Sequence, residues 1–134
     1  MWPSTREIAD YHHALPPEVY YVAKIAAYRM EDCGSCLRIV THMARKNGVP
    51  ASIVRAALEG EVHLLPEELQ AVYGFAQKQG ERVDDPSIRA WLREKYGDQG
   101  VIEMVMGIAS ARSFPAFKRA LGFAKRASEV NVEV

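Results

Sequence analysis

The sequence predicts a single all-α domain of seven or eight helices. Along most of the chain, apolar residues recur three and four positions apart, which is the spacing of one helix face. Prolines and glycines separate these periodic segments where helices are expected to begin and end. No segment shows apolar–polar alternation bounded by hairpin signals, so we expect no sheet. With 134 residues, the chain is long enough to bury a core as one domain, 1–134.

The first part of the chain is predicted to hold four helices. Ser4 and Glu7 have the spacing of a capping box and open a short first helix. An alanine-rich helix follows over residues 17–30, and the sequence EDCG interrupts the apolar pattern after it. A third helix is expected over 35–46, with Gly48 in the position of a C-terminal cap just after it, and a fourth over 51–60, which ends at Gly60.

The second part is predicted to hold four more. The helix over 66–80 has proline and glutamates in its first turn, and the helix over 86–97 begins after an Asp-Pro pair. Asp98 is expected to cap the next helix. Ser113 is expected to cap the last one, in which Pro115 falls early enough to be tolerated.

Composition and charge exclude several classes of partner. Lysines plus arginines and aspartates plus glutamates number 17 each, so the formal net charge is zero. This balance lacks the basic excess with which proteins bind nucleic acid or anionic membranes. The N-terminus has no apolar run behind a basic start, and no apolar run approaches the roughly 20 residues of a membrane helix. We expect a cytoplasmic protein that binds neither nucleic acid nor membrane.

The chemistry-bearing motif is a C-x-x-C pair, Cys33 and Cys36, which are the only cysteines in the chain. In the cytoplasm such a pair is not expected to be a structural disulfide, which favours redox or metal chemistry. The pair lies at or near a helix start, where unpaired N–H groups stabilise a thiolate. Glu31 and Asp32 act in the opposite sense by raising a thiol pKa, or serve as proton acceptors.

Three interpretations of the pair remain open: a redox pair, part of a metal site, or two inert buried thiols. A structural zinc site needs four ligands, and His42 is turned about 240° from Cys36 on an ideal helix. The other histidines are expected at the surface or in a loop, and they are His12, His13 and His63. We expect no metal and no other cofactor.

The segment around the cysteines resembles the core motif of a known family. This segment is VAKIAAYRMEDCGSCLRIVTHMARKNGVPASIVRAALEG. It is similar to the carboxymuconolactone decarboxylase-like superfamily, and within it to the alkylhydroperoxidase D-like branch. The resemblance covers roughly residues 16–125. It implies an all-α subunit that assembles into trimers or hexamers, and the apolar segments 18–28 and 102–110 are the candidates for subunit contacts.

The resemblance also implies a chemistry for the cysteine pair. Cys36 would attack a hydroperoxide and become a sulfenic acid, while Cys33 would supply a proton and then close the disulfide. A dithiol reductant, which in this family can be a lipoyl-bearing protein, would restore the two thiols. The implied function is a thiol-dependent peroxidase or disulfide oxidoreductase.

The sequence departs from the family at the proton relay. Tyr21 stands where the family has a glutamate, twelve residues before the first cysteine, and Val40 stands where it has a histidine, four residues after the second. Glu18, Tyr21 and Glu31 are the candidates for a substitute relay. Because apolar surroundings disfavour a thiolate, Val40 predicts weak peroxidase activity.

The alternative hypothesis is a non-catalytic helical oligomer that acts as a scaffold, a redox sensor or a small-molecule or partner-binding protein. The surroundings of Cys36 distinguish the two hypotheses. A sulfur in a polar pocket, within hydrogen-bond reach of a candidate relay residue, supports catalysis. A sulfur sealed among Ile39, Val40 and Met43 supports inert thiols.

Overall fold

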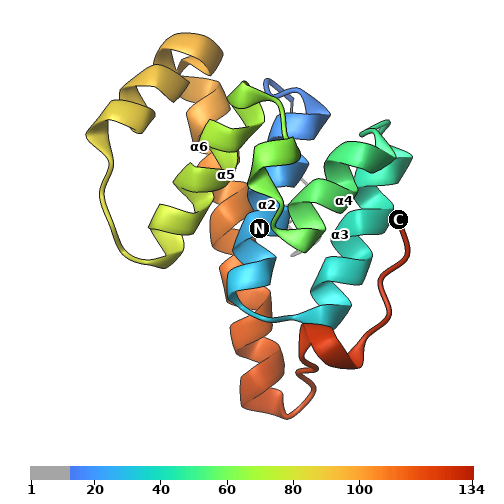
Figure 1. The fold of residues 1–134 in the computed structure, drawn as a ribbon. Helices are drawn as coiled ribbons and strands as arrows, with labels where there is room; N and C mark the ends of the chain where they lie inside the picture. Colours follow the sequence, from blue (N-terminus) through green and yellow to red (C-terminus); the bar gives the residue numbers. More distant parts are fainter. Residues whose placement is uncertain (1–12) are drawn as a thin grey trace.

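A computed structural model describes residues 13–134, and within them the chain is all-helical, as predicted, with no β-strand (Figure 1). Five α-helices and two short 3₁₀ helices occur in this part: α2 Pro17–Met30, α3 Gly34–Lys46, α4 Ala51–Glu59, η1 Val62–Leu64, α5 Glu67–Gly80, α6 Pro86–Leu121 and η2 Ala127–Glu129. None of the helices described is both long and apolar enough to cross a bilayer. The predicted first helix, with Ser4 and Glu7, lies outside the described residues.

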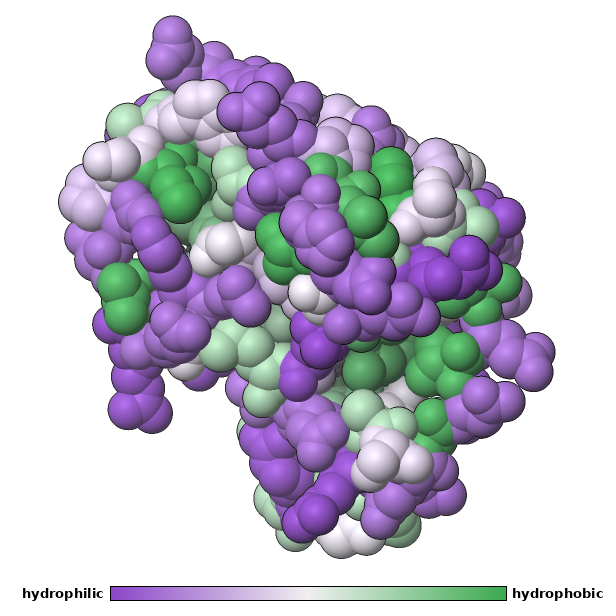
Figure 2. Space-filling model, viewed as in Figure 1, coloured by the Kyte–Doolittle hydropathy of each residue, from purple (hydrophilic) through white to green (hydrophobic). Residues whose placement is uncertain are grey.

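Helix α2 is the centre of the fold and packs against each of the other four α-helices. Helices α3 and α4 lie on one side of it, and α5 and α6 on the other (Figure 1). Every residue from Val19 to Tyr28 is buried, including the charged residue Lys24. Of the two segments considered for subunit contacts, 18–28 is therefore almost entirely inside its own chain. On the face shown in Figure 2, the remaining hydrophobic side chains form separate groups among hydrophilic ones.

Helix α6 consists of two helical pieces that meet at Gly97, where φ is 71° and ψ is 175° (Figure 1). Glycine adopts this positive φ without a steric penalty. The break predicted just before Asp98 is confirmed, but the break predicted at Ser113 is wrong. Ser113 instead donates a hydrogen bond from Oγ to the carbonyl of Ala109, 2.9 Å away, and the helix continues through the buried Pro115. The last two predicted helices are therefore one continuous piece of α6 beyond Gly97.

A buried carboxylate on α6 holds the segment that leads into α2. The Glu103 side chain accepts hydrogen bonds from the backbone N–H groups of His13, Ala14 and Leu15, at 2.9–3.0 Å. Burial raises the pKa of Glu103, but these hydrogen bonds outweigh it and hold the pKa below its ordinary value. The charged carboxylate thus ties the entry of the central helix to a helix far away in sequence.

The segment that follows α6, residues 122–134, crosses the start of α3, and we call it the C-terminal segment. The N–H of Gly34 donates to the carbonyl of Lys125 at 3.0 Å, and the N–H of Ala127 donates to Oδ1 of Asp32 at 2.9 Å. A Cβ atom at Gly34 would lie 2.6 Å from the carbonyl oxygen of Arg126. This close approach requires a glycine at position 34, between the two cysteines. Gly34 therefore makes room for the C-terminal segment.

Replacing Glu103 with glutamine is expected to lower the free energy of unfolding by about 2–4 kcal/mol, because an amide offers one accepting oxygen to several backbone donors. Glu94→Gln, at an exposed position of the same helix, should change it by less than about 0.5 kcal/mol. Denaturant titration followed by circular dichroism measures both values.

The same pair of proteins tests the sign of the pKa shift. A depressed pKa in the folded state stabilises the protein above the ordinary carboxyl pKa of 4.5, and this contribution is lost as the pH falls through the folded pKa. The difference between the wild type and Glu103→Gln should therefore shrink as the pH falls below that value. A difference that stays constant down to strong acid contradicts the role given to the carboxylate.

Gly34→Ala is expected to lower the free energy of unfolding by about 1–3 kcal/mol, because the added methyl overlaps the C-terminal segment. Gly74→Ala is the matched control, since a Cβ in that helical position meets nothing within 4 Å. This control should raise the free energy of unfolding by about 1 kcal/mol. The same sign of change for both variants in a thermal or denaturant melt contradicts the packing described.

Candidate functional site

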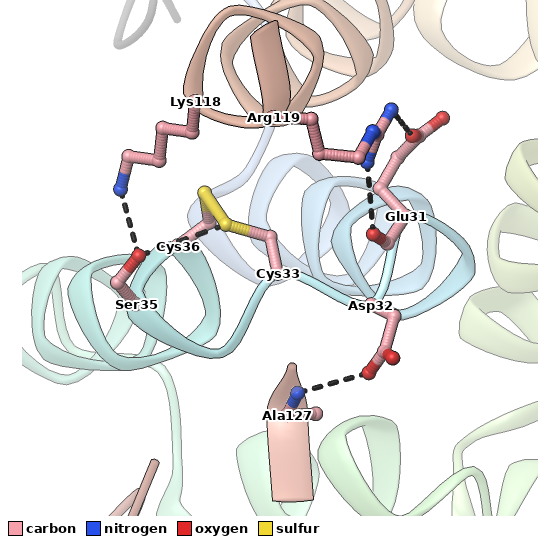
Figure 3. The surroundings of a disulfide bond; sticks show 8 residues. All are labelled: Glu31, Asp32, Cys33, Ser35, Cys36, Lys118, Arg119 and Ala127. Carbon is pink, nitrogen blue, oxygen red and sulfur yellow. Dashed lines mark hydrogen bonds and ion pairs between the residues drawn. A yellow bond between two sulfur atoms is a disulfide. The ribbon is translucent and has the colours of Figure 1, made fainter. Parts of the chain in front are cut away.

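The two cysteines form a disulfide at the start of α3, just after the turn that follows α2 (Figure 3). Cys33 is the N-cap residue of α3 and Cys36 lies in its first turn, with the two Cα atoms 5.3 Å apart. Asp32, with φ of 50°, makes the tight turn that separates the two helices. The prediction that the pair lies at a helix start is confirmed. Both residues are buried, with 2% of Cys33 and 4% of Cys36 exposed.

The two cysteines line different pockets. Cys36 lines a mainly apolar cavity of about 300 Å³ between α2, α3 and the end of α6, which we call the Cys36 pocket. Two lysines, Lys24 and Lys118, are also part of its wall. Cys33 lines a cavity of about 260 Å³, the Cys33 pocket, whose other residues include Glu31 and several charged residues of α6 and the C-terminal segment. The disulfide therefore has an apolar side and a charged side.

A chain of polar contacts connects a sulfur to a lysine (Figure 3). The Ser35 hydroxyl lies 3.7 Å from Sγ of Cys33, and the Lys118 ammonium donates to the same hydroxyl at 2.7 Å. Because this hydroxyl accepts from the ammonium, its own hydrogen can point to the sulfur. Such an arrangement can stabilise negative charge on sulfur or pass it a proton. No sequence signal points to Lys118, because only the packing of α6 brings it to Ser35, which lies 83 residues away in the chain.

Of the three candidate relay residues, Glu31 lies beside the cysteine pair. Its carboxylate accepts a 2.8 Å hydrogen bond from the Arg119 guanidinium and pairs with Nε of Arg112 at 3.5 Å (Figure 3 shows Arg119). Arg119 also donates to the main-chain carbonyl of Glu31 at 3.3 Å. The two guanidinium groups balance the charge of this carboxylate, so it opposes a neighbouring thiolate less than the sequence suggested.

The structure does not bring Glu18 or Tyr21 to the cysteines. The Tyr21 hydroxyl accepts a 3.0 Å hydrogen bond from Asn47, at the opposite end of α3 from Cys33. Glu18 lies one turn earlier on α2, near Tyr96 of α6. Burial is the main cause that raises the pKa of Tyr96, and the charge of Glu18 adds to this effect. Neither residue lines the Cys36 pocket or the Cys33 pocket. A relay through Glu18 or Tyr21 therefore has no support in the geometry.

The histidines lie away from the pair. His13, His42 and His63 are exposed, as expected, and His12 lies outside the described residues. His42 lines a different groove, together with Arg38. Across residues 13–134 there is no cluster of three or more histidine, cysteine, aspartate or glutamate side chains that could hold a metal ion.

The surroundings of Cys36 match neither extreme that the sequence suggested. Cys36 and Val40 belong to the buried core, with 4% and 1% of the residue exposed, yet both also line the Cys36 pocket together with Ile39 and Met43. Ile39 is itself 55% exposed. Cys36 thus lies where the core meets an apolar cavity.

The chain was also compared with known proteins. Searches against protein-family models, curated proteins and solved structures find no match in any of the three. The resemblance to the alkylhydroperoxidase D-like branch therefore remains a prediction from the motif, and the geometry of the cysteine site is the main basis for assigning a function.

Proposed function

We propose that this protein is a thiol-dependent oxidoreductase that reduces a hydroperoxide through Cys33 and Cys36. The observation that carries the proposal is the cysteine pair at the start of α3, bonded in its oxidised form and lined by a separate pocket on each side. An apolar pocket at one sulfur gives a substrate access, while the second sulfur is already within bonding distance.

The reaction balances with these two residues and an external dithiol. The Cys36 thiolate attacks one oxygen of the hydroperoxide and the O–O bond breaks, which leaves a sulfenic acid on Cys36 and an alkoxide that takes up a proton to become an alcohol. The Cys33 thiol then attacks the Cys36 sulfur and water leaves as the disulfide forms. Two electrons pass from the pair to the peroxide. The external dithiol returns them by thiol–disulfide exchange and becomes a disulfide itself.

Ser35 and Lys118 are proposed to replace the proton relay that the family has and this chain lacks. A nearby ammonium favours the thiolate over the thiol and so opposes the effect of apolar neighbours such as Val40. The hydroxyl of Ser35 lies between this ammonium and the Cys33 sulfur. Ser35 and Lys118 would therefore supply a positive charge and a path for a proton. They lie on α3 and α6, at positions other than those of the relay residues in the family motif.

The partners remain part of the proposal. A dithiol reductant would meet a small excess of positive charge at the Cys33 pocket, where three basic residues outnumber two carboxylates. The basic residues are Arg119, Lys125 and Arg126, and the carboxylates are Glu31 and Asp32. This charge favours a reductant with acidic groups near its dithiol, and a lipoyl-bearing protein is the class that the family resemblance implies. A cytoplasmic location, where such reductants keep thiols reduced, agrees with this chemistry.

Assembly into a trimer or hexamer is also a proposal. Ile102 is 52% exposed and Val105 is 45% exposed on the second piece of α6. These apolar side chains support 102–110 as the subunit contact, since 18–28 is used inside the chain.

A redox sensor without turnover is the second candidate. The observation that favours it is the C-terminal segment, which is hydrogen-bonded to Gly34 and Asp32 and lies over the start of α3. A change in the cysteine pair would then be transmitted to this segment rather than to a substrate.

Cys36→Ser is expected to abolish hydroperoxide consumption in the presence of a dithiol, because it removes the attacking sulfur. Cys33→Ser should leave a sulfenic acid on Cys36 that a dimedone probe traps and mass spectrometry detects. Full turnover by Cys36→Ser would end the assignment. Absence of turnover in the wild type, with reversible oxidation of both thiols, would favour the sensor.

Lys118→Met and Ser35→Ala are each expected to raise the pH at which thiol labelling of the reduced protein is half-maximal, by about one unit. The reason is that the thiolate loses the stabilising contact with the Ser35 hydroxyl and the Lys118 ammonium. Peroxide turnover near neutral pH should fall about tenfold in parallel. Maleimide labelling against pH, read for each cysteine by mass spectrometry, gives the midpoints. Lys46→Met, at an exposed position near the other end of α3, is the control. Unchanged midpoints in both site variants remove Ser35 and Lys118 from the mechanism.

A further inference from the structure

We infer that the Cys36 pocket binds a small apolar molecule that carries an anionic group, such as a medium-chain or aromatic carboxylate. The inference deepens the proposed function, because it names the class of substrate that would be presented to Cys36. Binding itself needs no turnover, so the inference can be tested separately from the redox chemistry.

The size and wall of the pocket fit a small apolar ligand. Its volume of about 300 Å³ is at the lower end of the range in which proteins bind small molecules. Aliphatic side chains of α3, including Val40 and Met43, face aromatic side chains of α6, including Phe114 and Phe117. Such a wall favours hydrocarbon or aromatic groups, and offers few partners to a sugar or another strongly polar molecule.

The charges on the wall are all of one sign. Lys24 and Lys118 are the charged residues that line the pocket in the described part of the chain, and no carboxylate lines it there. The Lys24 ammonium lies over the rings of Tyr20 and Tyr28, 5.3 Å and 5.9 Å from their centroids. An apolar wall with the half-buried cation Lys118 favours a ligand that is apolar over most of its length and negative at one position.

Lys118 is the cation best placed to hold the anionic group. Its ammonium has three N–H donors and gives one of them to Ser35, which is neutral, so this contact leaves the positive charge unbalanced. Its side chain is half-buried, which strengthens an ion pair relative to one in open water. Cys36 lines the same pocket. A carboxylate bound at Lys118 would therefore hold the apolar part of the ligand, and any hydroperoxide group on it, beside the sulfur.

The test compares three probes with one chain length and different head groups: octanoate, 1-octanol and octylammonium. Isothermal titration calorimetry of the full chain in its disulfide form gives their affinities at neutral pH. We expect octanoate to bind about tenfold more tightly than 1-octanol, since a partly exposed charge-assisted contact contributes roughly that much. Octylammonium should bind more weakly than both. Equal affinities for octanoate and 1-octanol, or no binding of octanoate, overturn the inference.

Variants then assign the preference to Lys118. Lys118→Met should remove the preference for octanoate over 1-octanol while both still bind, and Lys118→Arg should retain it. Lys95→Met is the matched control, because Lys95 is also on α6 but lies over Trp91 and pairs with Glu68. A full preference in Lys118→Met overturns the assignment to this residue.

Protection of the thiol locates the ligand. In reduced Cys33→Ser protein, octanoate should slow maleimide labelling of Cys36 at least tenfold at saturation. Binding without protection overturns the inference, because the ligand then lies elsewhere. The outcome is separable from the proposed function. If head-group selectivity is absent but turnover depends on Cys36, only the inference fails. If Cys36→Ser keeps full turnover, the proposed function fails while the selectivity of the pocket remains measurable.

Discussion

The burial of α2 on all sides is the constraint on which the rest of the structure depends. A helix that is buried over ten consecutive residues must be surrounded, so α3, α4, α5 and α6 are arranged around it and bury their own apolar faces against it. Each large side chain that this helix removes from water contributes about 1.5–3 kcal/mol to the free energy of unfolding. Helix α2 therefore forms the part of the core that the other four α-helices share. Its C-terminal end fixes where the turn at Asp32 lies, and with it the start of α3 and the disulfide. The position of the cysteine site is therefore set by α2, the most completely buried of the described helices, and the site follows directly after this helix in the sequence.

Two long-range contacts supplement this packing. The Glu103 carboxylate holds the entry of α2, and the C-terminal segment holds the start of α3 by its contacts with Asp32 and Gly34. Both contacts satisfy backbone N–H groups near helix starts that would otherwise lack partners. The start of α2 and the start of α3 are thus each fixed by a distant part of the chain.

Sequence reasoning predicts most of the helices and the position of the cysteine pair, because these depend on local signals. Apolar periodicity, prolines and glycines mark the starts of α2, α4, α5 and α6, and Gly97 marks the break. The error at Ser113 is also local in origin. A serine two residues before a proline is typical of a helix start. The same two residues are tolerated inside a helix when the serine bonds back to the preceding turn and the proline is buried.

The parts of the site that sequence reasoning missed are those that depend on tertiary packing. Ser35 and Lys118 are not among the candidate residues that the sequence suggests. Their contact exists because the last turns of α6 pack against the first turn of α3. The geometry gives no support to the candidates Glu18 and Tyr21, since distance along α2 carries no information about which end of α3 they meet. Tyr21 meets Asn47 at the far end. The polar neighbours of the Cys33 sulfur therefore depend on how the helices pack, which local sequence signals do not encode.

The different character of the two pockets bears on how one disulfide could serve two reactants. The Cys36 pocket is apolar and small, so it admits a substrate but not the surface of a protein reductant. The Cys33 pocket is charged and bounded by the C-terminal segment, whose hydrogen bonds to Gly34 and Asp32 lie directly over the start of α3. Under the proposed function, a small dithiol reaches a sulfur without disturbing this segment, whereas a protein-borne dithiol displaces it. Breaking two such hydrogen bonds costs about 1–3 kcal/mol, which binding of a partner can readily offset. Under the proposed function, access to the Cys33 sulfur would therefore be set by the C-terminal segment, and access to the Cys36 sulfur would be set by the ligand inferred for its pocket.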